Sequence, residues 1–430
     1  MTFSIHTLGC KVNWYESAAL SGIFIKNGAV LVSEDEKCDV FCINTCAVTE
    51  ESVRKSRQMI RRARRKNPDA VIAVCGCASQ TEPDFASKLP EADSVSGNKE
   101  KTRIYEYVCQ FLQTRERIIN IPEMDKEKCF ENMNSERIGT TRAALKVQDG
   151  CNNFCSYCII PYARGRIRSR DIDDAVREAE SLVAGGCREI VLAGIHIDNY
   201  GKDIGTYDLT DLLLRLGEIP DLIRVRLGSL EPVFVTEKNI EKIKNIKNLC
   251  HQFHLSLQSG CEKTLKAMNR HYTPDEFAAA ADLLRRTFSD CSITTDIITG
   301  FPGETEEDFL QSLDFAVRMK FAKVHVFPYS ERRGTRAASM DGKLPKDIKE
   351  DRCRRMIKAC APNEAEFYEN LVGKEKYVLF ETEKNGIFTG YTPEYAEIRV
   401  KCERDIRNLI FPVRIIKGQA DHAEGEVILS

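Results

Sequence analysis

The chain has 430 residues, of which 42% are hydrophobic and 30% charged, and its net charge at pH 7 is −2. This length exceeds the size at which one core stops growing, so two or three domains are expected. The composition is that of a soluble globular protein, and no apolar run is long enough to span a membrane. The net charge by itself says nothing about partners, so basic patches must be sought locally. The first residues lack the basic and apolar regions of a signal peptide, so the 18 cysteines are expected to be reduced in the cytoplasm.

The first third of the chain alternates apolar runs with helical patterns, as a doubly wound parallel α/β sheet does. Strands are predicted at residues 3–8, 39–44, 70–74 and 117–121, and helices at 17–26, 52–66 and 101–112. Residues 1–121 are therefore interpreted as a first domain, and the polar stretch 122–137 as a linker.

Cysteines follow three of these strands. Cys10 comes after the first strand, Cys46 after the second, and Cys75 with Cys77 after the third. Because ligands of such sheets bind outside the carboxyl ends of the strands, Cys10, Cys46 and Cys77 could meet as three ligands of a metal cluster. The alternative is burial as small apolar side chains, which is the role expected of Cys42. Periodicity does not decide between Cys75 and Cys77, although Cys77 lies further into the loop and is freer to turn toward a ligand.

The helix predicted at 52–66 is strongly basic. It carries eight Lys or Arg residues and no acid, among them Arg61, Arg62, Arg64 and Arg65. Its narrow apolar stripe can pack on the sheet and consists of Val53, Ser56, Ile60 and Ala63. A run of charge is usually a solvated face, but uncompensated cations repel one another, so a surface that contacts phosphates is favoured.

Three cysteines stand close together at Cys151, Cys155 and Cys158, with C-x3-C-x2-C spacing. Clustered thiolates in a reducing compartment are more often metal ligands than halves of disulfides. If the metal centre is a cluster of four irons, three protein ligands leave one iron open, and an open position is typical of a catalytic centre.

From residue 138 to 368 the alternation has a longer period. Strands are predicted at 143–148, 189–194, 223–227, 251–257, 292–299 and 323–328, with helices at 171–184, 209–216, 236–244, 274–288 and 304–319. Six strand-helix units predict an open or complete parallel barrel, whose active site lies at the carboxyl ends of the strands. The three-cysteine loop follows the first of these strands.

Polar residues on other barrel strands are candidate cofactor contacts. Glu189 enters an apolar strand and needs a partner once buried, for which the ammonium group of a bound amino acid would serve. Ser256 and Gln258 end the fourth strand, Asp296 interrupts the fifth, and Tyr157 lies in the cysteine loop. Each alone could be a loop or core residue, but together on one rim they would form a polar ligand site.

The last segment, residues 369–430, has strand patterns at 376–381, 387–391, 397–401, 411–416 and 426–429. Five short strands predict a small barrel of the oligonucleotide-binding type. From residue 371 onward it carries nine Lys or Arg and ten acids, so its net charge does not argue for RNA binding.

The cysteine loop resembles the radical S-adenosylmethionine superfamily, whose members use C-x3-C-x2-C to hold a 4Fe-4S cluster. The open iron of that cluster binds the amino and carboxylate groups of S-adenosylmethionine. Four motifs, in order along the whole chain, resemble the methylthiotransferases more specifically: Thr-Leu-Gly-Cys-Lys-Val-Asn at 7–13, Ile-Asn-Thr-Cys-Ala-Val-Thr at 43–49, Gly-Cys-Ala-Ser-Gln at 76–80 and Gln-Asp-Gly-Cys at 148–151.

This resemblance implies three domains: an N-terminal domain at 1–121 with an auxiliary cluster, a radical (β/α)6 partial barrel at 138–368, and an RNA-binding TRAM barrel at 369–430. It implies two 4Fe-4S clusters, one held by Cys151, Cys155 and Cys158. The other would be held by Cys10, Cys46 and Cys77.

Within the family, Gly9 to Asn13 together with Glu16-Ser17 is similar to the branch that acts on N6-threonylcarbamoyladenosine at position 37 of transfer RNA. The stretch 226–232 is similar to that branch too, although Gly228 stands where serine is more usual, and 78–79 is Ala-Ser where Tyr-Ala is common. The alternative substrates are isopentenyladenosine-37 and an aspartate of a ribosomal protein.

The reaction implied by the resemblance begins with one-electron cleavage of S-adenosylmethionine. The resulting deoxyadenosyl radical takes hydrogen from C2 of the adenine, sulfur is delivered from the auxiliary cluster, and a second S-adenosylmethionine supplies the methyl group. The expected partners are the anticodon loop of transfer RNAs that decode ANN codons and an electron donor such as flavodoxin or ferredoxin. A cytoplasmic monomer with no membrane partner is expected.

Overall fold

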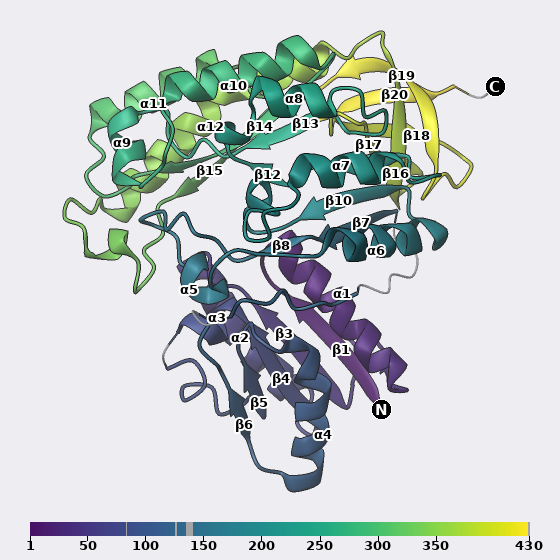
Figure 1. Ribbon diagram of the computed structural model, residues 1–430, viewed down its shortest axis with the longest axis vertical. Coiled ribbons are helices and arrows are strands. Elements are labelled where there is room, and N and C mark those ends of the chain that lie inside the picture. The colour runs from purple at the N-terminus through teal and green to yellow at the C-terminus, as the bar shows by residue number, and fades with distance from the viewer. Residues whose placement is uncertain (83, 125–126, 135–140, 429–430) are drawn as a thin grey trace.

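The structure is a computed structural model that describes residues 1–82, 84–124, 127–134 and 141–428. A parallel sheet with helices on both faces, a partial barrel and a small closed barrel follow one another along the chain (Figure 1). The α/β fold class and the order of its three parts are as predicted from the sequence. No helix within these ranges combines the length and the apolarity needed to cross a membrane.

The N-terminal sheet is entirely parallel, with strand order β2-β1-β3-β4-β5-β6. Its strands are β1 (Thr2–Thr7), β2 (Val30–Leu31), β3 (Val40–Thr45), β4 (Val71–Gly76), β5 (Ser94–Ser96) and β6 (Ile118–Asn120), and its helices α1 (Lys11–Lys26), α2 (Glu50–Lys66), α3 (Cys77–Thr81) and α4 (Ile104–Thr114). Apolar residues of α1 and α4 cover one face and those of α2 the other, which confirms the doubly wound arrangement.

Helix α1 begins at Lys11, earlier than the predicted start at residue 17. Cys10 is its N-cap in an extended conformation, and the buried Val12 and Tyr15 already belong to its packed face. Helix α2 follows the prediction closely, since Thr49 caps it through the backbone N–H of Ser52 and its buried residues are the predicted stripe.

The central part is an open parallel barrel made of two sheets, β11-β10-β7 and β12-β13-β14-β15. Its strands are β7 (Arg142–Lys146), β10 (Glu189–Ala193), β11 (Arg224–Arg226), β12 (Ser229–Leu230), β13 (Gln252–Leu255), β14 (Ser292–Thr299) and β15 (Lys323–Pro328). β11 is the third predicted strand, whereas β12, directly after it, was not predicted. Within residues 141–428 no ladder joins β7 to β15, so the barrel stays open on that side.

Six longer helices pack around the barrel: α6 (Ile172–Ala184), α7 (Leu209–Gly217), α8 (Glu237–Ile243), α10 (Pro274–Thr287), α11 (Glu306–Arg318) and α12 (Lys346–Glu369). Four short elements of this part were also not predicted, namely the paired strands β8 (Gln148–Asp149) and β9 (Arg168–Ser169) and the helices α5 (Ile160–Arg164) and α9 (Glu262–Ala267). Each has too few residues for a periodic pattern.

The inner side of the open barrel is covered by α1 of the N-terminal domain. Alternation along β7 turns Leu145 outward to α6, whereas Ala144 points inward and packs against the cluster that contains Tyr15 and Leu20 of α1. Figure 1 shows α1 between the N-terminal sheet and the barrel. The two domains therefore share one interface.

The C-terminal barrel is closed and has strand order β16-β17-β18-β20-β19. Its strands are β16 (Glu375–Lys384), β17 (Ile387–Tyr391), β18 (Glu397–Lys401), β19 (Ile410–Gly418) and β20 (Ala423–Val427). The five-stranded barrel is confirmed, with its last strand starting three residues before the predicted 426–429, of which residue 429 lies outside the described ranges.

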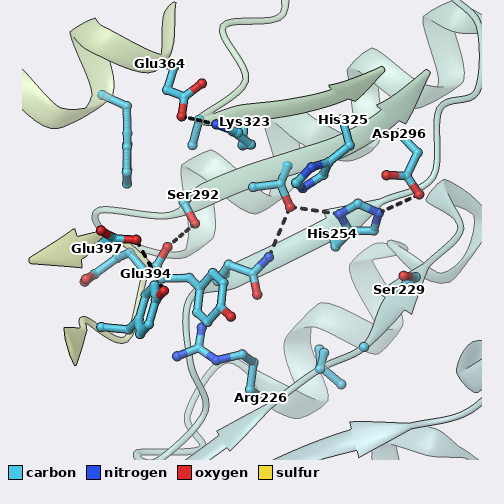
Figure 2. A pocket seen from close by; sticks show the side chains of 18 of the residues that line it. Arg226, Ser229, His254, Ser292, Asp296, Lys323, His325, Glu364, Glu394 and Glu397 are labelled. Carbon is cyan, nitrogen blue, oxygen red and sulfur yellow. Dashed lines mark hydrogen bonds and ion pairs between the residues drawn. The ribbon is translucent and has the colours of Figure 1, made fainter. Parts of the chain in front are cut away.

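This small barrel docks at the amino ends of the partial-barrel strands. Arg224 donates to the carbonyls of Tyr391 and Tyr377 at 2.8 and 2.6 Å. Arg226 donates to the Pro393 carbonyl at 2.9 Å, and the Ser292 hydroxyl donates to the Glu394 carbonyl (Figure 2). These hydrogen bonds to backbone carbonyls hold the loop after β17 in one place, and an ion pair of Arg142 with Glu381 at 2.6 Å adds to the contact.

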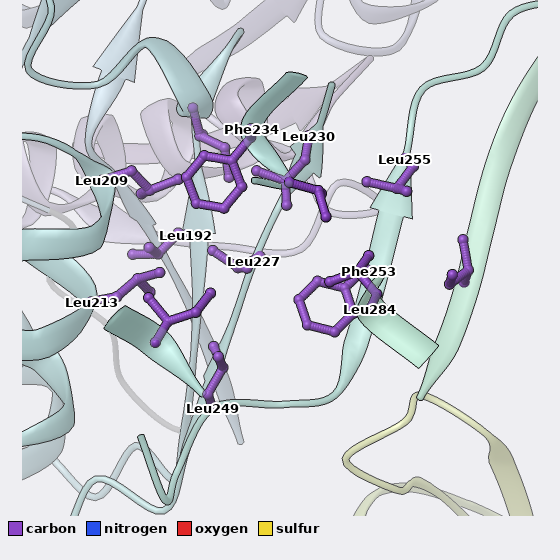
Figure 3. Packing of buried hydrophobic residues seen from close by; sticks show 14 of the residues in the cluster. Leu192, Leu209, Leu213, Leu227, Leu230, Phe234, Leu249, Phe253, Leu255 and Leu284 are labelled. Atoms are coloured by element: carbon purple, nitrogen blue, oxygen red, sulfur yellow. The ribbon is translucent and has the colours of Figure 1, made fainter. Parts of the chain in front are cut away.

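The core of the partial barrel lies between its strands and the outer helices. Leu192 of β10 and Leu227, directly after β11, meet Leu209 and Leu213 of α7, and Phe253 of β13 meets Leu284 of α10 (Figure 3). These side chains are almost fully buried. At roughly 25 cal/mol per Å² of apolar surface, such a cluster is the main contribution to the stability of the domain.

The predicted linker is packed where it is described. Met133 is 4% exposed, and its carbonyl accepts a hydrogen bond from the hydroxyl of Tyr15. Asn134 accepts a hydrogen bond at 2.9 Å from Arg170 of the barrel domain. Residues 125–126 and 135–137 of the predicted linker lie outside the described ranges.

Candidate active site: two groups of three cysteines

Cys151, Cys155 and Cys158, here called the barrel triad, lie in the loop that joins β8 to α5 at the carboxyl end of the barrel. The loop is fixed at its start, because Gly150 has φ +71° and a Cβ there would lie 1.9 Å from the Arg166 carbonyl oxygen. Gln148 donates to the Gly150 carbonyl at 2.7 Å, and the Cys151 N–H donates to the Gly165 carbonyl at 3.0 Å. The predicted position at the carboxyl ends of the strands is the observed one.

The thiols of the barrel triad suit a metal cluster. Burial, with a smaller contribution from the neighbouring Cys155, raises the pKa of Cys158 to about 12. Three thiolates so close together therefore need positive charge, which iron would supply. Arg270 already donates to Cys155 Sγ at 3.3 Å, and His196 Nδ1 lies 3.7 Å from Cys151 Sγ.

A polar group that the sequence did not single out surrounds this loop. His196 Nε2 lies 3.1 Å from Asp198 and 3.6 Å from Glu231. Glu231 is also 2.8 Å from Arg270 and accepts a hydrogen bond at 2.8 Å from Asn153. Buried acids beside a buried arginine can bind a ligand that carries both an ammonium and a carboxylate group.

Burial lowers the pKa of His196, but its contacts with Asp198, Cys151 and Glu231 outweigh burial and raise the pKa to about 12. His196 and Glu231 both follow barrel strands, His196 after β10 and Glu231 directly after β12. Attention to the first polar residues after each strand could have identified them.

Four of the five predicted cofactor contacts lie in the carboxyl half of the barrel. The Ser256 carbonyl accepts a hydrogen bond from Arg270 at 3.2 Å, which connects it to the barrel triad. Gln258, with φ +67°, donates from its N–H to the Asp296 carbonyl at 2.8 Å. Tyr157 packs beside a small apolar cluster, and burial raises its pKa well above 10.

The interpretation of Glu189 as a ligand contact is wrong. Glu189 is fully buried at the start of β10, at the opposite end of the strand from the barrel triad. Its carboxylate lies 2.6 Å from Arg226, 3.4 Å from Arg224 and 3.7 Å from Arg142. The positively charged partner that was predicted for buried Glu189 is therefore supplied by arginines of the two neighbouring strands. These arginines outweigh the effect of burial and hold the pKa of Glu189 below its usual value.

Cys10, Cys46 and Cys77, here called the sheet triad, lie at the carboxyl ends of β1, β3 and β4. Burial and the neighbouring Cys77 raise the pKa of Cys46 to about 11, and Cys10 adds to this shift. Asn98 donates to Cys77 Sγ at 3.4 Å. A Cβ on Gly9 would lie 3.0 Å from Cys46 Sγ, so the loop after β1 closely approaches the loop after β3. This donor set also fits an iron-sulfur cluster.

Cys75 does not share this position. It lies within β4, is 1% exposed, and packs in the same apolar cluster as Cys42. Burial raises its pKa to about 12. The prediction that Cys42 is a core residue is confirmed, and Cys75 has the same role.

The two triads lie on either side of one interface. Helix α5 begins two residues after Cys158 and packs against α3, which begins at Cys77. Asn98 donates both to Cys77 and, at 2.8 Å, to the carbonyl of Ala163 in α5. The loops of both triads are therefore in contact through few intervening residues.

A buried network of charges joins the same two loops. Glu16 of α1 is 2.8 Å from Lys146 and 2.8 Å from Arg164, and it also contacts Lys101. Asp149, two residues before Cys151, lies 2.7 Å from Lys146 and 3.1 Å from Arg164. All five side chains are buried. Because each buried charge has partners of opposite sign, the network resists separation of the two domains.

Several cations on the basic face of α2 form ion pairs with acids from other segments. Fewer of them are therefore available to contact phosphates than the sequence predicted. Arg64 pairs with Asp93 at 2.5 Å and donates to the Ala70 carbonyl at 2.8 Å. Arg61 lies 3.5 Å from Glu91. Within the described residues, the exposed Arg62 and Arg65 have no ion pair.

Comparison with known proteins agrees with this geometry. Residues 145–316 match the Radical SAM superfamily, and residues 2–97 match the uncharacterized protein family UPF0004. The chain is 38% identical, over 99% of its length and 96% of the relative, to the threonylcarbamoyladenosine tRNA methylthiotransferase MtaB of Bacillus subtilis (strain 168). It is 32% identical, over 99% of its length and 92% of the relative, to the tRNA-2-methylthio-N(6)-dimethylallyladenosine synthase of Caldicellulosiruptor saccharolyticus.

Among solved structures, the radical S-adenosylmethionine methyltransferase TsrM of Kitasatospora setae shares the fold, with a TM-score of 0.58 at 14% identity over 78% of this chain and 74% of that one. The assignment to a family rests on the identity of 38% and 32% to the two relatives above, each over 99% of this chain. The chain belongs to the family of radical S-adenosylmethionine tRNA methylthiotransferases.

Proposed function

We propose that the protein introduces a methylthio group at C2 of N6-threonylcarbamoyladenosine at position 37 of transfer RNA. The observation that carries the proposal is the meeting of two cysteine triads at one domain interface. The identity of 38% over the whole chain to a relative named for threonylcarbamoyladenosine supports the choice of substrate.

In this proposal the barrel triad holds a 4Fe-4S cluster, and the sheet triad holds a second one. The first cluster, when bound, supplies one-electron cleavage of S-adenosylmethionine, and the second marks the place of the sulfur. Glu231 and Arg270 would bind the ammonium and carboxylate ends of the cofactor, with Ser256, Gln258, Asp296 and Tyr157 as further candidate contacts.

The chain's own contribution is placement and exclusion of water. Helix α1 packs against β7, at the edge where the barrel is open, and so helps to keep water away from the site. The buried network around Glu16 keeps the two loops in register, which limits how far a sulfur atom has to be carried.

The transfer RNA is expected to offer its anticodon loop, where extruding a base costs less than opening a duplex. Arg62 and Arg65 are the exposed cations of α2 best placed to contact phosphates, with Arg61 beside them. We further propose that the enzyme modifies ANN-decoding transfer RNAs and uses two S-adenosylmethionine molecules per product. It would act as a cytoplasmic monomer with flavodoxin or ferredoxin as its reductant.

The alternative substrate is N6-dimethylallyladenosine. Relatives named for that nucleoside match 99% of the chain, but at 31–34% identity, below the 38% of the threonylcarbamoyl relative. Both substrates share every cysteine of the proposed clusters, so the cysteines do not distinguish them.

Mass spectrometry of transfer-RNA nucleosides from cells with and without the gene tests the function. The proposal expects 2-methylthio-N6-threonylcarbamoyladenosine to disappear in the deletion and to return with the wild-type gene. It expects no return with the Cys151→Ala gene. Loss of the dimethylallyl product instead would show the alternative substrate to be the correct one.

A further inference from the structure

A cavity of about 440 Å³ lies between the inner face of the partial barrel, α12 and the C-terminal barrel. Its barrel wall is polar and includes Ser229, Gln252, His254, Thr294, Asp296 and His325 (Figure 2). Gln252 and His254 both bond to the Thr294 hydroxyl, at 3.1 and 3.0 Å. An apolar group placed here would desolvate these side chains without replacing their bonds to water, whereas a polar group could form hydrogen bonds with them.

Most charged groups of this cavity already have a partner. Asp296 lies 3.3 Å from His254, and Lys323 pairs with Glu364 (Figure 2). Arg226 is held by Glu189 at 2.6 Å. Among the charged side chains that line the cavity, Lys11 alone has no ion pair or hydrogen bond of its side chain to any described residue. The cavity therefore has one uncommitted positive charge.

The position of Lys11 links the cavity to the reaction centre. Lys11 is the first residue of α1 and follows Cys10 of the sheet triad. It also lines a second cavity, of about 360 Å³, together with Arg142 of β7 and Val191 of β10. Lys11 thus lies where the N-terminal domain meets the barrel, and it lines both cavities.

We infer that this cavity receives the N6 substituent of the target adenosine, and that Lys11 pairs with the carboxylate of that substituent. Lys11 is then a specificity-determining residue. The inference rests on the proposed function, since a threonylcarbamoyl group ends in a carboxylate and a hydroxyl, whereas a dimethylallyl group has neither. In a partly enclosed cavity, the ammonium group of Lys11 gains a charge-assisted hydrogen bond from the carboxylate of the threonylcarbamoyl group. A dimethylallyl group would displace water from the ammonium group and offer no hydrogen bond in its place.

The test compares three anticodon stem-loop RNAs that differ only at nucleotide 37, which is threonylcarbamoyladenosine, its methyl ester or unmodified adenosine. Binding is measured with full-length, anaerobically reconstituted protein. The wild type is expected to bind the free acid at least about tenfold more tightly than the ester, the range of one charged hydrogen bond. Lys11→Met keeps the length of the side chain but removes its charge, and it is expected to bind acid and ester within about a factor of three.

Two variants serve as controls. Lys358→Met removes an exposed charge from α12 and should keep the wild-type preference for the acid. Lys11→Arg keeps the charge and should also retain a preference. Iron content and the visible absorption of the clusters are measured in each variant, because Lys11 adjoins Cys10. If the methionine variant loses iron, Lys11→Gln is measured in its place.

The outcomes separate this inference from the function on which it rests. A wild-type protein that fails to methylthiolate the threonylcarbamoyl stem-loop overturns the function. A wild type that does so but binds the ester as tightly as the acid overturns the inference alone. An iron-replete Lys11→Met protein that still prefers the acid also overturns it.

Discussion

The barrel triad and the sheet triad differ in how the fold brings their cysteines together. Cys151, Cys155 and Cys158 come from a single loop, so local spacing alone places them within reach of one metal cluster. The cysteines of the sheet triad come from three strand ends and meet only because β1, β3 and β4 pair in parallel, with Thr45 opposite Gly76. The first is a local motif, whereas the second depends on the tertiary structure of a whole domain.

A glycine with positive φ nevertheless precedes a ligand in both triads. Gly9 and Gly76 both have φ +108°, and Gly150 has φ +71°. Each allows a sharp turn of the chain as a strand ends, directly before a cysteine of its triad. The difference between the triads therefore lies in what surrounds each turn.

Removal of single ligands has the largest expected effect and separates the triads by function. Alanine at Cys151, Cys155 or Cys158 should abolish formation of deoxyadenosine from S-adenosylmethionine, because the cluster that cleaves it loses a ligand. Alanine at Cys10, Cys46 or Cys77 should leave that cleavage in place and abolish the methylthio product. Cys75→Ala is the matched control and should affect neither. Normal product from a sheet-triad variant would remove the second cluster from the mechanism.

Glu16→Gln tests whether the two triads behave as one unit. It leaves Lys101, Lys146 and Arg164 with one buried negative charge fewer, and loss of a partner in a buried ionic network typically costs about 3–5 kcal/mol. The urea midpoint of the reconstituted protein should fall accordingly, whereas Glu116→Gln on an exposed loop should leave it unchanged. An unchanged midpoint in Glu16→Gln would show that the network contributes little.

The pH dependence of the same network has a defined sign. Burial raises the pKa of Glu16, but Arg164, Lys101 and Lys146 outweigh burial and hold that pKa well below 4.5. A group whose pKa is lowered by folding stabilises the folded state fully above its unfolded pKa. The contribution of Glu16 to the free energy of unfolding should be complete above about pH 4.5 and should decline only as the pH falls further. Urea titrations of wild type and Glu16→Gln at several pH values measure this contribution.

Alanine at the two glycine turns sharpens the contrast between local and tertiary assembly. A Cβ at position 76 would lie 2.5 Å from the Thr45 carbonyl oxygen, and one at position 150 would lie 1.9 Å from that of Arg166. Gly76→Ala should therefore lose the iron of the sheet triad, about half of the total, while Gly150→Ala should lose that of the barrel triad. Gly28→Ala is a control with positive φ but no atom within 4 Å of the new Cβ. Equal iron in all three variants would contradict a role for strain at these turns.

The smallest expected effect concerns α2. Its basic sequence predicts a face that contacts phosphates, whereas the fold pairs several of its cations with acids from other segments. The double variant Arg62→Gln, Arg65→Gln should weaken transfer-RNA binding several-fold and reduce the slope of log K against log salt by about 0.7 for each phosphate that it no longer neutralises. Arg64→Gln should instead lower stability, by about 1–3 kcal/mol, because it removes the partner of Asp93. An unchanged salt slope in the double variant would mean that this face of α2 is only solvated.

The sequence was sufficient for features that follow from local pattern. Strand and helix periodicity predicted four of the six strands of the doubly wound sheet, six of the seven barrel strands and the C-terminal barrel, and missed only the short strands β2, β5 and β12 of these sheets. The spacing of Cys151, Cys155 and Cys158 indicated a metal site, and the apolar run around Cys42 indicated a core residue. In each case the information lies within a few neighbouring residues.

Features set by contacts between distant segments were missed or misread. Nothing near Glu189 in the sequence shows that Arg224 lies opposite it on the next strand, with Arg226 two residues further along that strand. The basic run of α2 gives no sign that Asp93 follows on another strand edge. His196 and Glu231 lack a spacing pattern, because they come from different strand ends and meet only in the folded site.

Helix α1 has a consequence for exchanging parts between related enzymes. The helix belongs by sequence to the first domain, yet its first residue faces the barrel cavity, and Glu16 is bound by Lys146 and Arg164 of the second domain. A hybrid joined near residue 121 would take this helix from one parent and its partners from the other. The exchangeable unit is therefore the helix together with the strands it covers, and substrate preference should follow that unit in such hybrids.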